Sequence, residues 1–109
     1  MRQKIENKQI IYIPGVDMTA ADNITAFLRQ DAHEWTYTTG GNGVNVVSAT
    51  QITVTVPYET AMKLLATDCE LQVCWTEDVD GTDVPRATDP LVIPVGKLIA
   101  NKGYNPNAN

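Results

Sequence analysis

The chain is poor in the residue types from which most catalytic sites are built. Its 109 residues include one histidine, one serine, two cysteines and seven aromatic side chains. The serine, Ser48, lies in the stretch VVSAT and lacks the glycines of a nucleophile elbow. With so few aromatics, the core must be built mostly from Ile, Val, Leu and Ala. We therefore expect a protein that is not an enzyme and that uses no cofactor.

Basic residues are also scarce. Eight Lys and Arg are set against thirteen Asp and Glu, which gives a formal net charge of −5. This charge repels polyphosphate, and the basic residues are scattered rather than gathered into a stripe. Binding to nucleic acid or to an anionic membrane surface is therefore disfavoured.

No apolar run approaches the ~20 residues that a membrane-spanning helix needs. The opening MRQKIENKQI carries charge but no apolar stretch follows it, so we expect no signal peptide and synthesis in a cytoplasm. On one extended strand Cys69 and Cys74 would point to opposite faces, with Cα atoms roughly 17 Å apart. A disulfide needs less than about 7 Å, so two reduced thiols are expected.

The length fits one domain that buries roughly 65% of the surface of its unfolded chain. Its hydrophobic content of 43% is typical of a globular protein. We expect a polar N-terminal arm over residues 1–8, a folded domain over 9–100 and a flexible C-terminal tail over 101–109.

Alternating apolar and polar residues dominate this domain. In residues 51–56, Ile52, Val54 and Val56 alternate with threonines, and residues 69–75 show the same period of two. The dipeptide Asp80-Gly81 predicts a tight hairpin turn. The predicted strands are residues 9–13, 24–30, 34–38, 51–56, 69–75, an edge segment near 84–90 flanked by prolines, and 91–99 interrupted by Pro94.

Residues 58–65 carry apolar residues at helical spacing after Pro57, which predicts a short helix of about two turns. Residues 39–43 are rich in glycine and predict a mobile loop. Together these patterns predict a mainly β fold, an immunoglobulin-like β-sandwich of about seven short strands with one short helix.

Few side chains suggest a ligand site. His33, between Asp31 and Glu34, could act as an acid–base catalyst, but we interpret it as a solvated loop residue. Glu77, Asp78, Asp80 and Asp83 could bind calcium, which takes about six to eight oxygen ligands. The neighbouring sequence lacks the final glutamate and flanking helices of an EF-hand, so we interpret this turn as a charged hairpin tip.

Three further groupings have a structural interpretation and a functional one. Cys69, Cys74 and His33 lack the spacing and the fourth ligand of a zinc site. The glycines of residues 40–43 lack the Lys-Ser/Thr of a phosphate loop. Trp75 is expected in the core. Trp35 has two interpretations of equal weight, a core residue or part of a sugar-binding platform.

The second half of the chain resembles small structural proteins of tailed bacteriophages, in particular the N-terminal module of upper baseplate proteins. That pattern is a Thr-rich strand, a short T-x-E-E-T-x-x-L-like segment, a strand with an aromatic or basic end, a D-G hairpin and a return strand closing in V-G-x-x-L. The matching elements are residues 52–56, Glu59-Thr60 with Leu64, residues 71–75, Asp80-Gly81, and Val95-Gly96 with Leu98-Ile99.

This resemblance implies a β-sandwich module that assembles in a virion, with no catalytic, cofactor-binding or metal-binding residue to assign. Its partners would be other virion proteins and further copies of itself. The expected contact regions are the two termini, the loop at residues 39–43 and the edge around residues 85–90. The alternative is a carbohydrate- or peptide-binding module, dependent on calcium, with Trp35, Tyr37 and the turn at 77–83 at the ligand. A small enzyme using His33 is the third hypothesis.

Overall fold

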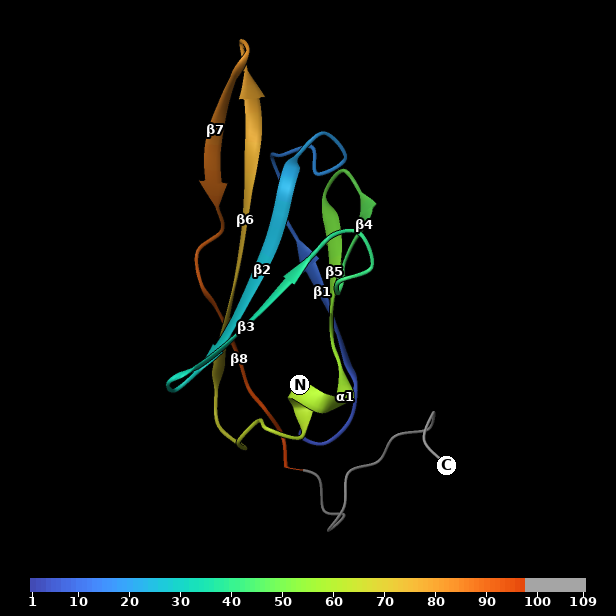
Figure 1. The fold of residues 1–109 in the computed structure, drawn as a ribbon, viewed down its shortest axis with the longest axis vertical. Helices are drawn as coiled ribbons and strands as arrows, with labels where there is room; N and C mark the ends of the chain where they lie inside the picture. Colours follow the sequence, from blue (N-terminus) through green and yellow to red (C-terminus); the bar gives the residue numbers. More distant parts are fainter. Residues whose placement is uncertain (98–109) are drawn as a thin grey trace.

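The computed structural model describes residues 1–97 and has a mainly β fold. Strands make up 58% of the chain and helix 4%, in two antiparallel sheets with one short helix. The two sheets pack face to face and are seen next to each other in Figure 1, with the long β6–β7 hairpin projecting at one end. The predicted β-sandwich is confirmed.

The smaller sheet has three strands in the order β1-β5-β4. Its strands are β1 (Asn7–Tyr12), β4 (Val44–Ser48) and β5 (Gln51–Val56). On β5 the apolar residues Ile52, Val54 and Val56 are almost completely buried, as the alternation predicts. The central position of β5 explains why its pattern is the clearest in the sequence.

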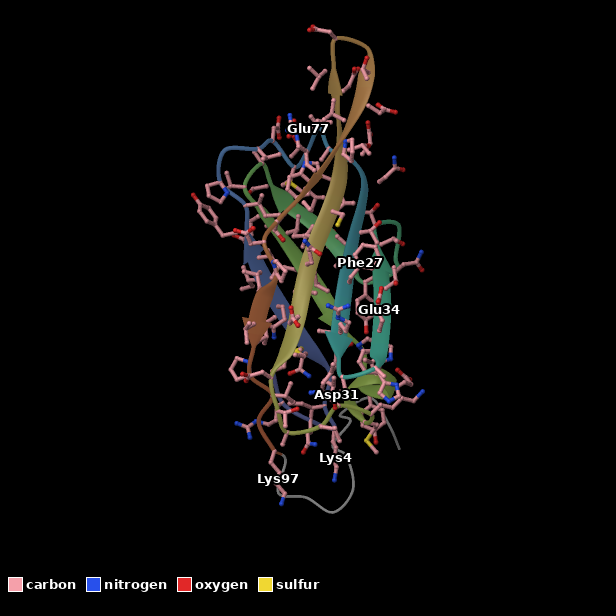
Figure 2. All side chains as sticks on the ribbon, turned by 90° about the vertical axis from the view of Figure 1, so that its left-hand side faces the viewer. Lys4, Phe27, Asp31, Glu34, Glu77 and Lys97 are labelled. Carbon is pink, nitrogen blue, oxygen red and sulfur yellow. The ribbon has the colours of Figure 1, made fainter. Side chains whose placement is uncertain are left out.

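The larger sheet has five strands in the order β3-β2-β6-β7, and β8 also pairs with β6. The strands are β2 (Asp22–Gln30), β3 (His33–Thr38), β6 (Cys69–Val79), β7 (Thr82–Ala87) and β8 (Leu91–Ile93). Figure 2 views this sheet face on, with the smaller sheet behind it. The inner face of β6 presents Cys69, Leu71, Val73 and Trp75 to the core between the sheets.

The helix α1 (Tyr58–Ala61) is a single turn, shorter than the predicted two turns over residues 58–65. The buried side chain of Gln30 accepts a hydrogen bond from the Leu65 N–H at 2.8 Å and donates to the Leu65 carbonyl at 3.0 Å. It also donates to the Thr67 carbonyl. These bonds fix the chain after α1 in an irregular path, which local helical spacing could not reveal.

One other expectation needs correction, and one strand was missed. Residues 1–8 are not a free arm, because β1 begins at Asn7 and the first residues bond to residues 94–97. The Met1 ammonium donates to the Pro94 carbonyl at 2.8 Å, and the Gln3 N–H donates to the Gly96 carbonyl at 2.9 Å. Strand β4 was not predicted, because a bulge between Val46 and Ser48 breaks its alternation. The expected tail at 101–109 lies outside the described residues.

The β6–β7 hairpin extends beyond the rest of the sheet. The last β2–β6 pair is Asp22 with Thr76, whereas β6 and β7 pair to Val79 and Thr82. The turn has positive φ at Asp80 (52°) and Gly81 (83°), which confirms the predicted Asp-Gly hairpin. Residues 77–84, here called the hairpin tip, therefore project from a molecule measuring 54 × 28 × 20 Å.

Candidate interaction surfaces

Exposed large hydrophobic side chains gather on the strands at the borders of the sheets. Five of the eight such residues lie on β1, β4 or β8, each of which pairs with one strand only. They are Ile10, Tyr12, Val47, Leu91 and Val92; the other three are Met62, Leu65 and Val79. An unpaired edge strand with exposed apolar side chains is a template for pairing with another chain.

Strand β1 combines both properties. Ile10 and Tyr12 are each 68% exposed, and Lys8 lies on the same outer face. The Ile13 N–H donates to the Thr50 carbonyl at 2.7 Å, which fixes the phase of the β1–β5 ladder. Because hydrogen-bonded pairs alternate, Gln9 and Ile11 bond to β5, while the N–H and C=O groups of Lys8, Ile10 and Tyr12 point to the free edge.

A hollow of about 530 Å³ lies at the opposite border, between β3 and β4. It is lined by Tyr37, Val44, Asn45, Thr55, Pro57 and residues 41–43. The loop at residues 39–43 forms its rim and returns to the smaller sheet, where the Gly43 carbonyl accepts from the Thr55 N–H at 2.8 Å. The predicted loop is thus a crossing between the sheets, with positive φ at Gly40, Gly41 and Gly43.

Tyr37 anchors this border to the helix. Its hydroxyl donates to Thr60 Oγ1 of α1 at 3.1 Å, and its side chain is buried. Burial raises the pKa of the Tyr37 phenol above its ordinary value of 10.0, and the hydrogen bond to Thr60 offsets part of that rise. The Tyr37 hydroxyl is therefore neutral and bonded to Thr60, while its side chain forms part of the wall of the hollow.

The structure does not bring together the aromatic residues and the acidic turn of the alternative hypothesis. Trp35 pairs with Leu28, which pairs with Leu71 of β6, so Trp35 lies level with Leu71. At ~3.3 Å per residue, the path from Leu71 to Asp80 is roughly 30 Å. One small ligand cannot contact Trp35 and the hairpin tip at once.

The acidic hairpin tip has its own local explanation. Asp78 Oδ1 accepts a hydrogen bond from the Gly81 N–H at 2.9 Å, which supports the turn. Glu77 pairs with Arg86 of β7 at 3.3 Å. Within residues 1–97 no group of three His, Cys, Asp or Glu side chains is arranged to hold a metal ion.

His33 and Trp35 stack on one face of β3, with ring centroids 5.8 Å apart. Glu34 lies between them in sequence and therefore points to the opposite face. Asp31 lies in the turn before β3, with a φ of 52°. The suggested pairing of His33 with a neighbouring carboxylate is not formed; its imidazole packs on an aromatic ring instead.

The remaining candidates belong to the core sheet. Trp75 is 4% exposed, as predicted for a core residue, and its buried Nε1 has no hydrogen-bond partner within the described chain. Cys69 and Cys74 both lie on β6 as free thiols, and only Cys69 is buried. Burial raises the pKa of the Cys69 thiol above its ordinary value of 9.0. The two cysteines form no disulfide with each other.

A second hollow, of about 290 Å³, was not predicted from the sequence. It lies on the outer face of the larger sheet around Phe27 and Arg29. Arg29 is flanked by Glu34 on β3 and Glu70 on β6, with which it shares a rung. Figure 2 shows Phe27 and Glu34 on neighbouring strands of this face. Its lining residues alternate along β2 and β6, and this alternation is visible in the sequence. The pairing of β3, β2 and β6 that brings them together is a long-range property, which local sequence does not reveal.

No helix within residues 1–97 has the length and apolar character needed to cross a membrane. Comparisons of the chain with protein-family models, curated proteins and solved structures find no match.

Proposed function

We propose that this protein is a structural subunit of a tailed-bacteriophage particle, joining neighbouring tail, baseplate or capsid proteins through protein–protein contacts. It resides in the virion, is made in the host cytoplasm, and works without a catalytic centre or cofactor. Its partners are other virion proteins and further copies of itself.

The observation that carries the assembly role is the gathering of exposed apolar side chains on edge strands. When another chain covers apolar area at a border, the free energy falls by about 25 cal/mol for each Å² removed from water. The same strand can offer its unpaired N–H and C=O groups to that chain. The phage setting is supported by the resemblance of residues 50–99 to phage structural modules.

Two observations made on the source organism test this proposal. Genes for terminase, portal or tail proteins are expected beside the gene for this chain, whereas metabolic neighbours would contradict the phage setting. Quantitative mass spectrometry of density-purified particles should then find the chain at a fixed ratio to an established structural protein. Its absence from intact particles would contradict a structural role.

A second candidate function, binding of a carbohydrate or peptide, is favoured by the hollow beside Tyr37. Its volume of about 530 Å³ falls in the range of small-molecule sites, and Asn42 and Asn45 offer polar groups at its wall. Titration with oligosaccharides or peptides should shift the NMR signals of Asn42 and Asn45 if this function holds. Unchanged signals across a glycan and peptide panel would eliminate it.

A further inference from the structure

We infer that β1 pairs with β1 of a second copy of this chain, so that two small sheets join into one continuous six-stranded sheet. The inference rests on the proposed assembly function and names the surface and the partner. The joined sheet would have the order β4-β5-β1-β1-β5-β4, related by a twofold axis beside Ile10.

The backbone determines which residues can pair. Lys8, Ile10 and Tyr12 direct their N–H and C=O groups to the free edge, and no backbone hydrogen bond within residues 1–97 joins them to another strand. Antiparallel pairing about Ile10 places each of the three opposite another outward-directed residue. About six hydrogen bonds between the chains result, two for each opposed pair.

The side chains favour this register. Ile10 faces Ile10 of the second copy, and Lys8 faces Tyr12, so no two ammonium groups are opposed. The Lys8 ammonium is placed beside an aromatic ring, which attracts cations. A shift toward the C-terminus would oppose Lys8 to Pro14, which has no N–H to donate. The register centred on Ile10 therefore uses every free donor and acceptor of this edge.

The charge at the two ends of the molecule favours the antiparallel arrangement of two copies. The hairpin tip carries Glu77, Asp78, Asp80 and Asp83, and Arg86 pairs with Glu77. The opposite end carries Arg2, Lys4, Lys63 and Lys97 interspersed with Asp31, Glu59 and Asp68, so it is close to neutral and far less acidic than the tip. Figure 2 shows Lys4 and Lys97 at the end away from the hairpin.

Antiparallel pairing keeps the two acidic tips apart. Strand β1 begins beside this near-neutral end, where the Asn7 side chain bonds to the Arg2 backbone, and runs towards the hairpin end. Two β1 strands running in opposite directions lay the acidic tip of each copy towards the near-neutral end of the other. Parallel pairing would instead place two acidic tips beside each other, where like charges repel.

Sedimentation equilibrium of the full chain tests the inference. The wild type should dimerise reversibly, and Ile10→Lys should weaken dimerisation about tenfold or more, because two ammonium groups would then meet at the axis. Val92→Lys is the matched control, because Val92 is 64% exposed on another edge strand, β8. It should leave the dissociation constant unchanged.

A cross-link keeps the test independent of the folding of the lysine variant. In a Cys74→Ser background, Ile10→Cys should form a disulfide-linked dimer on mild oxidation, because opposed hydrogen-bonded residues have Cα atoms about 5.5 Å apart. The matched Val92→Cys variant should cross-link at least about tenfold more slowly.

A monomeric wild type, equal effects of Ile10→Lys and Val92→Lys, or equal cross-linking of the two cysteine variants would overturn the inference. The virion role is tested separately, by mass spectrometry of purified particles. The β1 pairing can therefore fail while the chain is still found in particles, and the two failures are distinguishable.

Discussion

At the scale of single residues, Leu71 and Leu91 show how position decides the contribution of a leucine side chain to the free energy of unfolding. Leu71 is 1% exposed on the inner face of β6, whereas Leu91 is 38% exposed on β8. Leu71→Ala should lower the free energy of unfolding by about 3 kcal/mol, through lost burial and a residual cavity. Leu91→Ala should cost under about 1 kcal/mol in urea unfolding, and equal losses would contradict the packing described here.

Tyr37 gives a prediction for the dependence of stability on pH. Its folded-state pKa is raised above the unfolded value near 10, so the unfolded chain loses this proton first as the pH rises. The contribution of Tyr37 to stability is complete below about pH 10 and declines as the pH approaches the raised pKa. Cys69 acts in the same direction from about pH 9.

Tyr37→Phe should therefore unfold with a weaker dependence on pH above 10 than the wild type. At neutral pH it should lose about 1 kcal/mol, because the Thr60 hydroxyl loses its partner. Urea titrations across the alkaline range measure both effects, and comparison with wild type cancels the contribution of Cys69. Parallel curves above pH 10 would show that the phenol is ionised equally in both states.

At the scale of elements, the hairpin tip should behave separately from the sandwich. Gly81 has a φ of 83°, and a Cβ there would meet no neighbouring atom, so Gly81→Ala carries conformational strain without a clash. We expect a loss of roughly 1 kcal/mol confined to the turn. Amide exchange should accelerate in residues 77–84 and stay unchanged in β2, with Thr82→Ala as control. Acceleration throughout the sheet would contradict a tip that projects freely.

The same scale shows what local sequence could predict. Strand β5 and the inner half of β6 have a buried face, which imposes a period of two that alternation detects. The Asp80-Gly81 turn depends on φ at two residues and is equally local. The path after α1 depends on Gln30, far away in sequence, and β4 is broken by a bulge. Neither leaves a periodic signal.

The exposed edge strands were predictable only in part, because the position of a strand within its sheet depends on pairing with distant segments. The prolines of residues 85–90 mark β7 as an edge, and β7 does border the larger sheet. The exposure of Ile10 and Tyr12 follows from the position of β1 at the end of its sheet, which depends on pairing with a strand some forty residues later. Residues 1–8 looked uncommitted because their partners, residues 94–97, lie at the other end of the chain.

At the scale of the whole molecule, the account describes a sandwich whose core is closed and whose borders remain available. The sheets bury their apolar faces against each other, while β1 leaves unpaired backbone groups beside exposed Ile10 and Tyr12. The hairpin tip is acidic and the opposite end is close to neutral, so antiparallel association keeps the two acidic tips apart.

Residue-resolved amide exchange at low and high protein concentration tests the role of β1 most directly. The account predicts that the amides of Lys8, Ile10 and Tyr12 become protected as concentration rises, while those of Gln9 and Ile11, already bonded to β5, change little. If the three outward-directed amides exchange at the same rate at every concentration, β1 is not a pairing edge and the account of assembly through it is wrong.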